Sequence, residues 1–455
     1  MKKFKPLYQF RQDLFNSLSE KKGLVQELCH IKNSPFAEAA LPALEELIHR
    51  IPKFEKLIYG HSFPMEEKDL GYCPSAFFLP ESLFFEVRWV ALQVLRKRKE
   101  IIKFISYRDQ IEKLILLGQT TEALELLEDC KQKLGYSMWY YEMKLSVYGL
   151  MGDSEQMIRL VSEVNQIHKE DKRGYVSLLL HFLYKRSMEN ISALDFDMEL
   201  ESIFKRNSKT YLKDRDNYFL FRLNFYCNSS IKELAPMLLF ESTNSLIDRY
   251  ILLIRIIKVC SIQSGLENYA LTEVGSHLYK RLKDPDLLPL VALCKEKLPE
   301  SYFDTAFVSV LDHYYVGEYE EVIRECKSYI AKNPSDFDFI KLYCHSLILA
   351  KKGFQNITTD ADTPINKLAH LVYLIKNGDN IKENIYKFYQ FSKRLYGFSI
   401  CAELDYFHKR QQDMNDTTNL HFMFKRTFDP YFAKMFDETD EQIGKSPLAR
   451  MAVPI

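Results

Sequence analysis

The chain has 455 residues, of which 47% are hydrophobic, so it can bury a large core and is not an intrinsically disordered protein. Its 62 lysines and arginines balance 62 aspartates and glutamates, which excludes a general electrostatic attraction to nucleic acid or to an anionic membrane. With 15 glycines and 16 prolines in a sequence rich in Leu, Lys, Glu, Ile, Phe and Tyr, the composition favours an all-α fold with short turns.

The start of the chain and its cysteines indicate a reducing compartment. The opening MKKFKPLYQFRQDLF lacks the apolar run of a signal peptide. The apolar stretch YILLIRIIKVC at 250–260 is too short to span a bilayer and contains Arg255 and Lys258. Nine cysteines are scattered without a CxxC pair, as in proteins without disulfides. We therefore expect a cytoplasmic protein without a transmembrane helix.

The first predicted region covers residues 1–75. It contains two helical runs, LFNSLSEKKGLVQELCHI and ALPALEELIHRI, but no repeated unit. The stretch SFPMEEKDLGYCPSAFFLP at 62–80 has three prolines, which predicts a boundary loop before the main body at 76–425.

A basic run follows the predicted helix FFEVRWVALQVL, and its four cations are Arg96, Lys97, Arg98 and Lys99. Such a cluster can bind phosphates, so a nucleic-acid-binding subunit is the alternative function that the sequence offers. Cations are also favourable at a helix C-terminus without any ligand, because they interact with the helix dipole. Both interpretations of the run stay open at this stage.

A sequence pattern recurs after thirty-four residues. Residues 114–130 read LILLGQTTEALELLEDC, and residues 148–164 read YGLMGDSEQMIRLVSEV. In both copies, apolar residues at helical spacing precede a glycine, Gly118 or Gly152, and a second amphipathic stripe follows it. Each copy therefore predicts a helix, a tight turn that needs the conformational freedom of glycine, and another helix.

A third copy stands at 313–329, where HYYVGEYEEVIRECKSY has Tyr319 two residues after Gly317, and Pro334 closes the unit. These residues resemble the tetratricopeptide repeat, a helix–turn–helix unit of thirty-four residues with glycine in the turn, an aromatic residue two positions later and proline at its end. The resemblance implies an α-solenoid of stacked helix pairs over 76–425, with the helical N-terminal region in front of it.

The copies also depart from that family. Met157 and Val322 stand where a small residue is expected, and Gly135 stands where the first copy should have its proline. An irregular helical bundle is therefore the second interpretation of the fold. Helical periodicity continues at 174–186, 217–227, 245–260, 273–283, 287–298, 339–353 and 370–397. It fades after about residue 436, and we expect 426–455 to be a C-terminal tail.

The sequence contains no motif of enzymes or metal sites. It has no GxxxxGK[ST], GxGxxG, GxSxG or HExxH, and no Cys/His ligand spacing. We therefore expect a non-enzymatic protein without a cofactor or metal. An enzyme whose acid and base groups come from separate helices is a third candidate, because one sequence cannot reveal such an arrangement.

The resemblance implies that the first helix of each pair lines a concave groove that binds a protein or peptide partner. SMWYYE at 137–142 begins such a helix, and we expect one ring of its Trp-Tyr pair to face solvent, although aromatic residues in such units also pack between helices. The residues expected to contact the partner are Arg108, Trp139, Tyr140, Glu142, Phe307, Tyr314 and Tyr343.

The function implied by the resemblance is that of an interaction scaffold or adaptor. Bacterial proteins that look like this often serve as adaptor or sensor subunits of multi-protein systems, including regulatory and phage-defence systems. No residue of the sequence selects among these systems, so the resemblance predicts a partner but not its identity.

Overall fold

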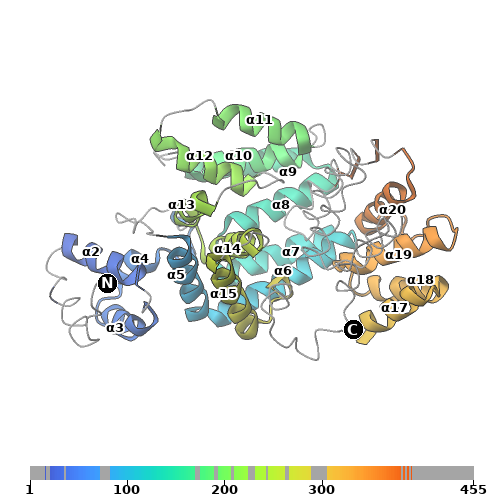
Figure 1. Cartoon of the computed structure of the whole chain (residues 1–455). Coiled ribbons are helices and arrows are strands. Elements are labelled where there is room, and N and C mark those ends of the chain that lie inside the picture. The colour runs from blue at the N-terminus through green and yellow to red at the C-terminus, as the bar shows by residue number, and fades with distance from the viewer. Residues whose placement is uncertain are drawn as a thin grey trace.

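The computed structural model describes residues 16, 21–34, 37–71, 82–169, 175–188, 193–205, 210–223, 231–241, 244–261, 266–287, 305–380, 383–384, 387–388 and 391. In these ranges the regular structure is helical and contains no strand, so the all-α prediction is confirmed there. None of the helices described has the length and apolar character needed to cross a membrane. Figure 1 shows the first helices at one end of the molecule and the last ones at the other.

The N-terminal helices have a small hydrophobic core of their own. They are α2 (Lys21–Lys32), α3 (Ala37–Arg50) and α4 (Lys53–Tyr59), and they close on one face of α5 (Leu83–Arg96). Trp89 of α5 stacks on Tyr59 with 5.8 Å between ring centroids. A buried ion pair between Lys32 and Glu86 also joins α2 to α5. The predicted N-terminal helical region is therefore fastened to the main body through α5. Residues 72–81, where its boundary was predicted, lie outside the described residues.

The first two copies of the recurrent pattern form consecutive helices. They are α6 (Arg98–Leu116), α7 (Thr120–Leu134), α8 (Met138–Met151) and α9 (Ser154–Ile167), and each packs on the next. Gly118 and Gly152 have φ values of +75° and +71°, the left-handed region that favours glycine. The turns therefore lie where the sequence predicted them. A further helix, α10 (Tyr175–Ser187), packs on both α8 and α9.

The third copy forms the same local structure near the other end of the described chain. It comprises α17 (Thr305–Val316) and α18 (Tyr319–Ile330), which are followed by α19 (Phe337–Leu349) and α20 (Pro364–Asn377). Each of these helices packs on the next, and Gly317 in the first turn has a φ of +92°. Tyr329 stacks on Phe339 with 3.8 Å between ring centroids, which joins α18 to α19. α20 also contacts α6.

The helices between these two stretches fold back on the first ones. They are α11 (Ala193–Lys205), α12 (Thr210–Leu223), α13 (Ile231–Glu241), α14 (Leu246–Ser261) and α15 (Leu266–Leu282). α5 packs against α13, α14 and α15, while α14 also touches α8 and α15 also touches α6. In a linear solenoid each repeat contacts its neighbours in sequence. Here helices far apart in sequence share one core. Figure 1 shows α5, α14 and α15 next to one another in the middle of the molecule.

Residues 61–71, which we call the crossing segment, link the start of α14 to the turn between α7 and α8. The carbonyl of Ser62 accepts a hydrogen bond from the amide of Leu246 at 2.7 Å, and the carbonyl of Pro64 accepts one from Tyr136 at 2.7 Å. The segment also contains the short 3₁₀ helix η2 (Glu67–Asp69), and Leu70 is buried in the main core. The expected boundary loop at 62–80 thus begins as a packed part of the molecule.

The crossing segment explains the glycine at position 135. Gly135 has a φ of +77°, and a Cβ atom there would lie 2.4 Å from the carbonyl oxygen of Pro64. The proline that the repeat family has at this place would require a negative φ. The position therefore serves the close approach of residues 61–71 and departs from the family pattern for that reason.

We predict that Gly135→Ala destabilises the protein more than an alanine at another glycine turn. The left-handed backbone costs roughly 1–3 kcal/mol for a residue with a side chain, and overpacking against Pro64 adds a cost of similar size, about 1–3 kcal/mol. Gly152→Ala has the strained backbone but no atom within 4 Å, and Gly353→Ala has neither problem. Urea unfolding of the three variants should rank them in that order. Equal stability of the Gly135 and Gly353 variants would contradict this account.

Candidate functional site

The aromatic pair predicted to face a partner lies inside the molecule. Trp139 and Tyr140 are each 4% exposed, and Trp139 packs edge-on against Phe104 with 4.9 Å between ring centroids. Every residue of α8 from 138 to 143 is buried, as expected for a helix that neighbours cover on all sides. The expectation that one of the two rings faces solvent is therefore wrong for this structure, whereas their contact with a partner stays an untested prediction.

Three of the other residues predicted to contact the partner also have their polar partners inside the protein. Arg108 forms ion pairs with Asp284 at 2.9 Å and with Asp286 at 3.1 Å. The hydroxyl of Tyr314 is hydrogen-bonded to His345, and that of Tyr343 donates to the carbonyl of Gln355 at 2.8 Å. These side chains come from α6, α17 and α19, and each is buried and has a different hydrogen-bonding partner. The side chain of Phe307 lies outside the described residues.

Glu142, also predicted to contact a partner, is the centre of a buried charge cluster. Its carboxylate accepts hydrogen bonds from Arg186 of α10 and, at 3.2 Å, from Arg222 of α12. Arg222 also lies 3.7 Å from a carboxylate oxygen of Glu241 on α13. Burial alone would raise the pKa of Glu142, but the two guanidinium groups outweigh burial and lower it. The role of Glu142 in this structure is to hold α8, α10 and α12 together.

We predict that Glu142→Gln destabilises the fold strongly. The substitution keeps the size of the side chain but removes the negative charge that Arg186 and Arg222 share, and breaking a buried pair in this way costs about 3–5 kcal/mol. Glu155→Gln is a matched control because Glu155 is an exposed residue in the first turn of α9. Urea unfolding at neutral pH measures both variants. A Glu142 variant as stable as its control would contradict the assigned role.

The basic run is divided between paired and exposed cations. Arg96 donates to Glu45 and, at 2.9 Å, to Glu55, and its guanidinium lies over the ring of Tyr59. Lys97 lies 3.5 Å from Glu55. Arg98 and Lys99 are exposed. The acidic residues thus neutralise half of the cluster that was proposed to bind phosphate, and phosphate binding by the other half stays a prediction.

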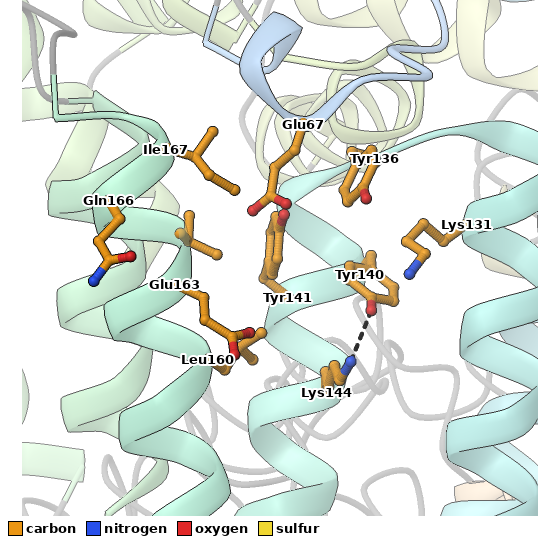
Figure 2. A pocket seen from close by; sticks show the side chains of 11 residues that line it. Glu67, Lys131, Tyr136, Tyr140, Tyr141, Lys144, Leu160, Glu163, Gln166 and Ile167 are labelled. Carbon is orange, nitrogen blue, oxygen red and sulfur yellow. Dashed lines mark hydrogen bonds between the residues drawn. The ribbon is translucent and has the colours of Figure 1, made fainter.

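A pocket of about 560 Å³ lies between α7, α8 and α9 (Figure 2). We call it the tyrosine pocket. Its residues are three tyrosines, four charged side chains and a few side chains of α9, namely Tyr136, Tyr140, Tyr141, Glu67, Lys131, Lys144, Glu163, Leu160, Val164, Gln166 and Ile167. Glu67 reaches it from the crossing segment, as Figure 2 shows. Among the residues predicted from the sequence, Tyr140 is the one that lines this pocket.

One side of the tyrosine pocket carries two lysines that share one carboxylate. Glu128 of α7 accepts hydrogen bonds from Lys131, from Lys144 at 2.6 Å and from the hydroxyl of Tyr140. The Lys131 ammonium lies 5.5 Å and 5.3 Å from the ring centroids of Tyr136 and Tyr140, and Lys144 donates to the Tyr140 hydroxyl at 2.9 Å. Burial would raise the pKa of Glu128, but these donors lower it to about 2.

The other side of the pocket is acidic. The carboxylate of Glu67 lies next to the hydroxyl of Tyr141 (Figure 2). Tyr141 is 1% exposed, and its hydroxyl forms no hydrogen bond of regular geometry in the described structure. Burial and the nearby Glu67 both raise the pKa of Tyr141, so it stays a neutral phenol. Glu163 adds a second carboxylate from α9, and it pairs at 2.8 Å with Arg159 on the exposed side of that helix.

We predict that Glu128 makes stability fall in acid. The folded-state pKa is below the ordinary value of 4.5, so its contribution is present above pH 4.5 and is lost as the pH falls towards about 2. Because 35% of the Glu128 side chain is exposed and solvent screens its ion pairs, the contribution is on the order of 1 kcal/mol. Glu128→Gln should lower the free energy of unfolding near neutral pH and flatten its decline in acid. Glu125→Gln, which changes an exposed carboxylate of the same helix, should do neither.

A second groove of about 500 Å³ runs along the opposite flank of α9, between it and α10. It is lined by Ile158, Val161, Ser162, Asn165, Gln166, Lys169, His181 and Tyr184. Gln166 lines both hollows, so α9 forms a ridge between them. Ile158 and Ile167 stand on this helix with 56% and 46% of their surface exposed. Both grooves lie along the second helix of the repeated unit. The resemblance to the repeat family had predicted a binding groove along the first helix.

Neither a metal nor a known relative assigns chemistry to this site. Within the part of the chain that the structure describes, no three His, Cys, Asp or Glu side chains are placed to hold a metal ion. Comparison of the chain with protein-family models, curated proteins and solved structures found no match. The site is therefore interpreted from its own contacts and charges.

Proposed function

We propose that the protein is a non-enzymatic interaction scaffold that binds a protein partner over α9. The binding surface, which we call the α9 surface, consists of Ile158, Val161, Glu163, Gln166 and Ile167. The observation that carries the proposal is the exposure of two isoleucines on one amphipathic helix, beside grooves on both of its flanks.

The two isoleucines are suited to anchor a partner. Ile167 follows Ile158 by nine positions, which places them about 13 Å apart along the helix axis and on opposite flanks of the ridge. Each borders one of the grooves, so a segment lying across the ridge covers both side chains. Burial of their exposed surface drives association, while the polar groups around them supply a rim, an arrangement common in protein interfaces.

The architecture supports the same proposal. Helix pairs with a glycine turn recur at 98–167 and 305–330, and we propose that they are degenerate tetratricopeptide-like units within a curved helical array. Such arrays present extended surfaces to other proteins. A place as adaptor in a bacterial regulatory or phage-defence system is consistent with this proposal but rests on the resemblance alone.

We predict that Ile158→Asp/Ile167→Asp loses the partner without loss of stability. Both residues are exposed, so the charges disturb an interface but not the core. The tagged full-length chain, purified from its native host, should bring down a defined protein, and the double variant should retain about tenfold less of it. Ile102→Asp/Val316→Asp is the matched control, because both residues are exposed on other helices.

The same purification with added nuclease separates the two functions that the sequence offered. A captured protein that survives nuclease and depends on the two isoleucines supports the scaffold. Capture that disappears with nuclease would favour the nucleic-acid-binding alternative, with Arg98 and Lys99 as the exposed cations to mutate. Equal capture by the double variant and its control would reject the α9 surface.

A further inference from the structure

We propose that the tyrosine pocket receives a basic side chain, a lysine or an arginine, from the partner segment bound on the α9 surface. This inference rests on the proposed function and adds the chemical class of residue that the partner must present. It follows from the division of charge in the pocket, from a buried hydroxyl beside Glu67, and from the apolar residue at the rim.

The lysine side of the pocket already has its counter-ion. Glu128 forms ion pairs with both Lys131 and Lys144. The same two ammonium groups lie over the rings of Tyr136 and Tyr140 and make cation–π contacts there. An acidic ligand would have to compete with Glu128 for two lysines that also contact the tyrosines. Such an exchange replaces one ion pair by another, so it contributes little to the free energy of binding.

The carboxylates on the acidic side of the pocket are available to bind a cation. Glu67 forms no ion pair with any residue that the structure describes, although it lies at a pocket with two lysines on its far side. Glu163 has Arg159 as its partner, but both side chains are more than half exposed, so water screens that pair. A cation beside Glu67 therefore gains a carboxylate without displacing a buried partner, and Glu163 adds a further negative charge to the lining of the pocket.

Tyr141 is the independent observation that points to a ligand. Its hydroxyl is buried at the pocket and has the Glu67 carboxylate beside it, but without the regular hydrogen-bond geometry that fully satisfies a buried polar group. An ammonium or guanidinium group beside Glu67 can donate a hydrogen bond to this oxygen. The hydroxyl can then donate its own proton towards Glu67, so ligand, phenol and carboxylate are satisfied together.

The remaining walls fit the stem of a long basic side chain. Leu160 and Val164 line the pocket beside the tyrosines, and lysine and arginine stems pack on such surfaces while their charged ends reach polar groups. Ile167 stands at the rim with its exposed face next to the pocket. The partner segment should therefore carry an apolar residue close to its basic one.

A peptide selection on the full-length protein tests this inference. A randomised linear peptide library displayed on phage is selected on the unmodified protein, on Glu67→Gln/Glu163→Gln and on the control Glu155→Gln. We expect peptides with lysine or arginine beside an apolar residue to be enriched on the unmodified and control proteins. A synthetic copy of the most enriched peptide should bind the double variant with a Kd about tenfold higher, and added salt should weaken its binding to the unmodified protein.

The result that would overturn the inference is equally defined. Enrichment of acidic or uncharged residues at the shared position, equal affinity for the double variant, unchanged affinity when norleucine replaces the basic residue of the peptide, or no enrichment at all would each reject a basic ligand. The melting temperature of the double variant is measured as a control, and a value equal to that of the unmodified protein shows that the fold is intact. If Ile158→Asp/Ile167→Asp abolishes peptide binding while Glu67→Gln/Glu163→Gln does not, the scaffold proposal stands and this inference alone fails.

Discussion

The pairing of Glu142 with Arg186 and Arg222 is the contact on which the middle of the molecule depends. All three side chains are buried on different helices, and loss of the Glu142 carboxylate removes the negative charge that the two buried guanidinium groups share. Asp248 of α14 adds a second constraint, because it accepts hydrogen bonds at 2.9 Å from the first amides of α8. α8 is therefore fixed from both sides, and with it the position of Tyr141 in the pocket.

The sequence predicted the turns and helices, which depend on neighbouring residues, but not the helix packing, which depends on residues far apart in the chain. The glycine turns at 118, 152 and 317 were found because helical periodicity and glycine conformation are local properties. The packing of α5 on α13, α14 and α15 has no such local pattern. The crossing segment shows the same limit, because its prolines indicated a loop while the contact of Pro64 with Gly135 became visible only in three dimensions.

The candidate site was harder to predict than the fold, for a reason seen in α8 and α9. In α8 the apolar residues surround the helix, so its sequence cannot tell which ring faces out, and Trp139 proved to be a core residue. In α9 the amphipathic stripe is clear, but Ile158 and Ile167 stand at its two edges, where a sequence pattern would assign them to the core. Glu67 reaches the pocket from a segment without helical periodicity.

In the interaction that we propose, the exposed isoleucines of α9 and the charged pocket have different roles. Exposed isoleucines supply affinity through burial but accept many apolar partners, because the hydrophobic effect has no direction. Carboxylates at a fixed place discriminate, since a wrongly placed or wrongly charged residue opposite them is penalised. Because Lys131 and Lys144 stay bound to Glu128, the pocket presents its acidic residues at one side only. A segment that places its basic residue there has one favourable direction across α9, so under our proposal the charge arrangement sets the orientation of the partner.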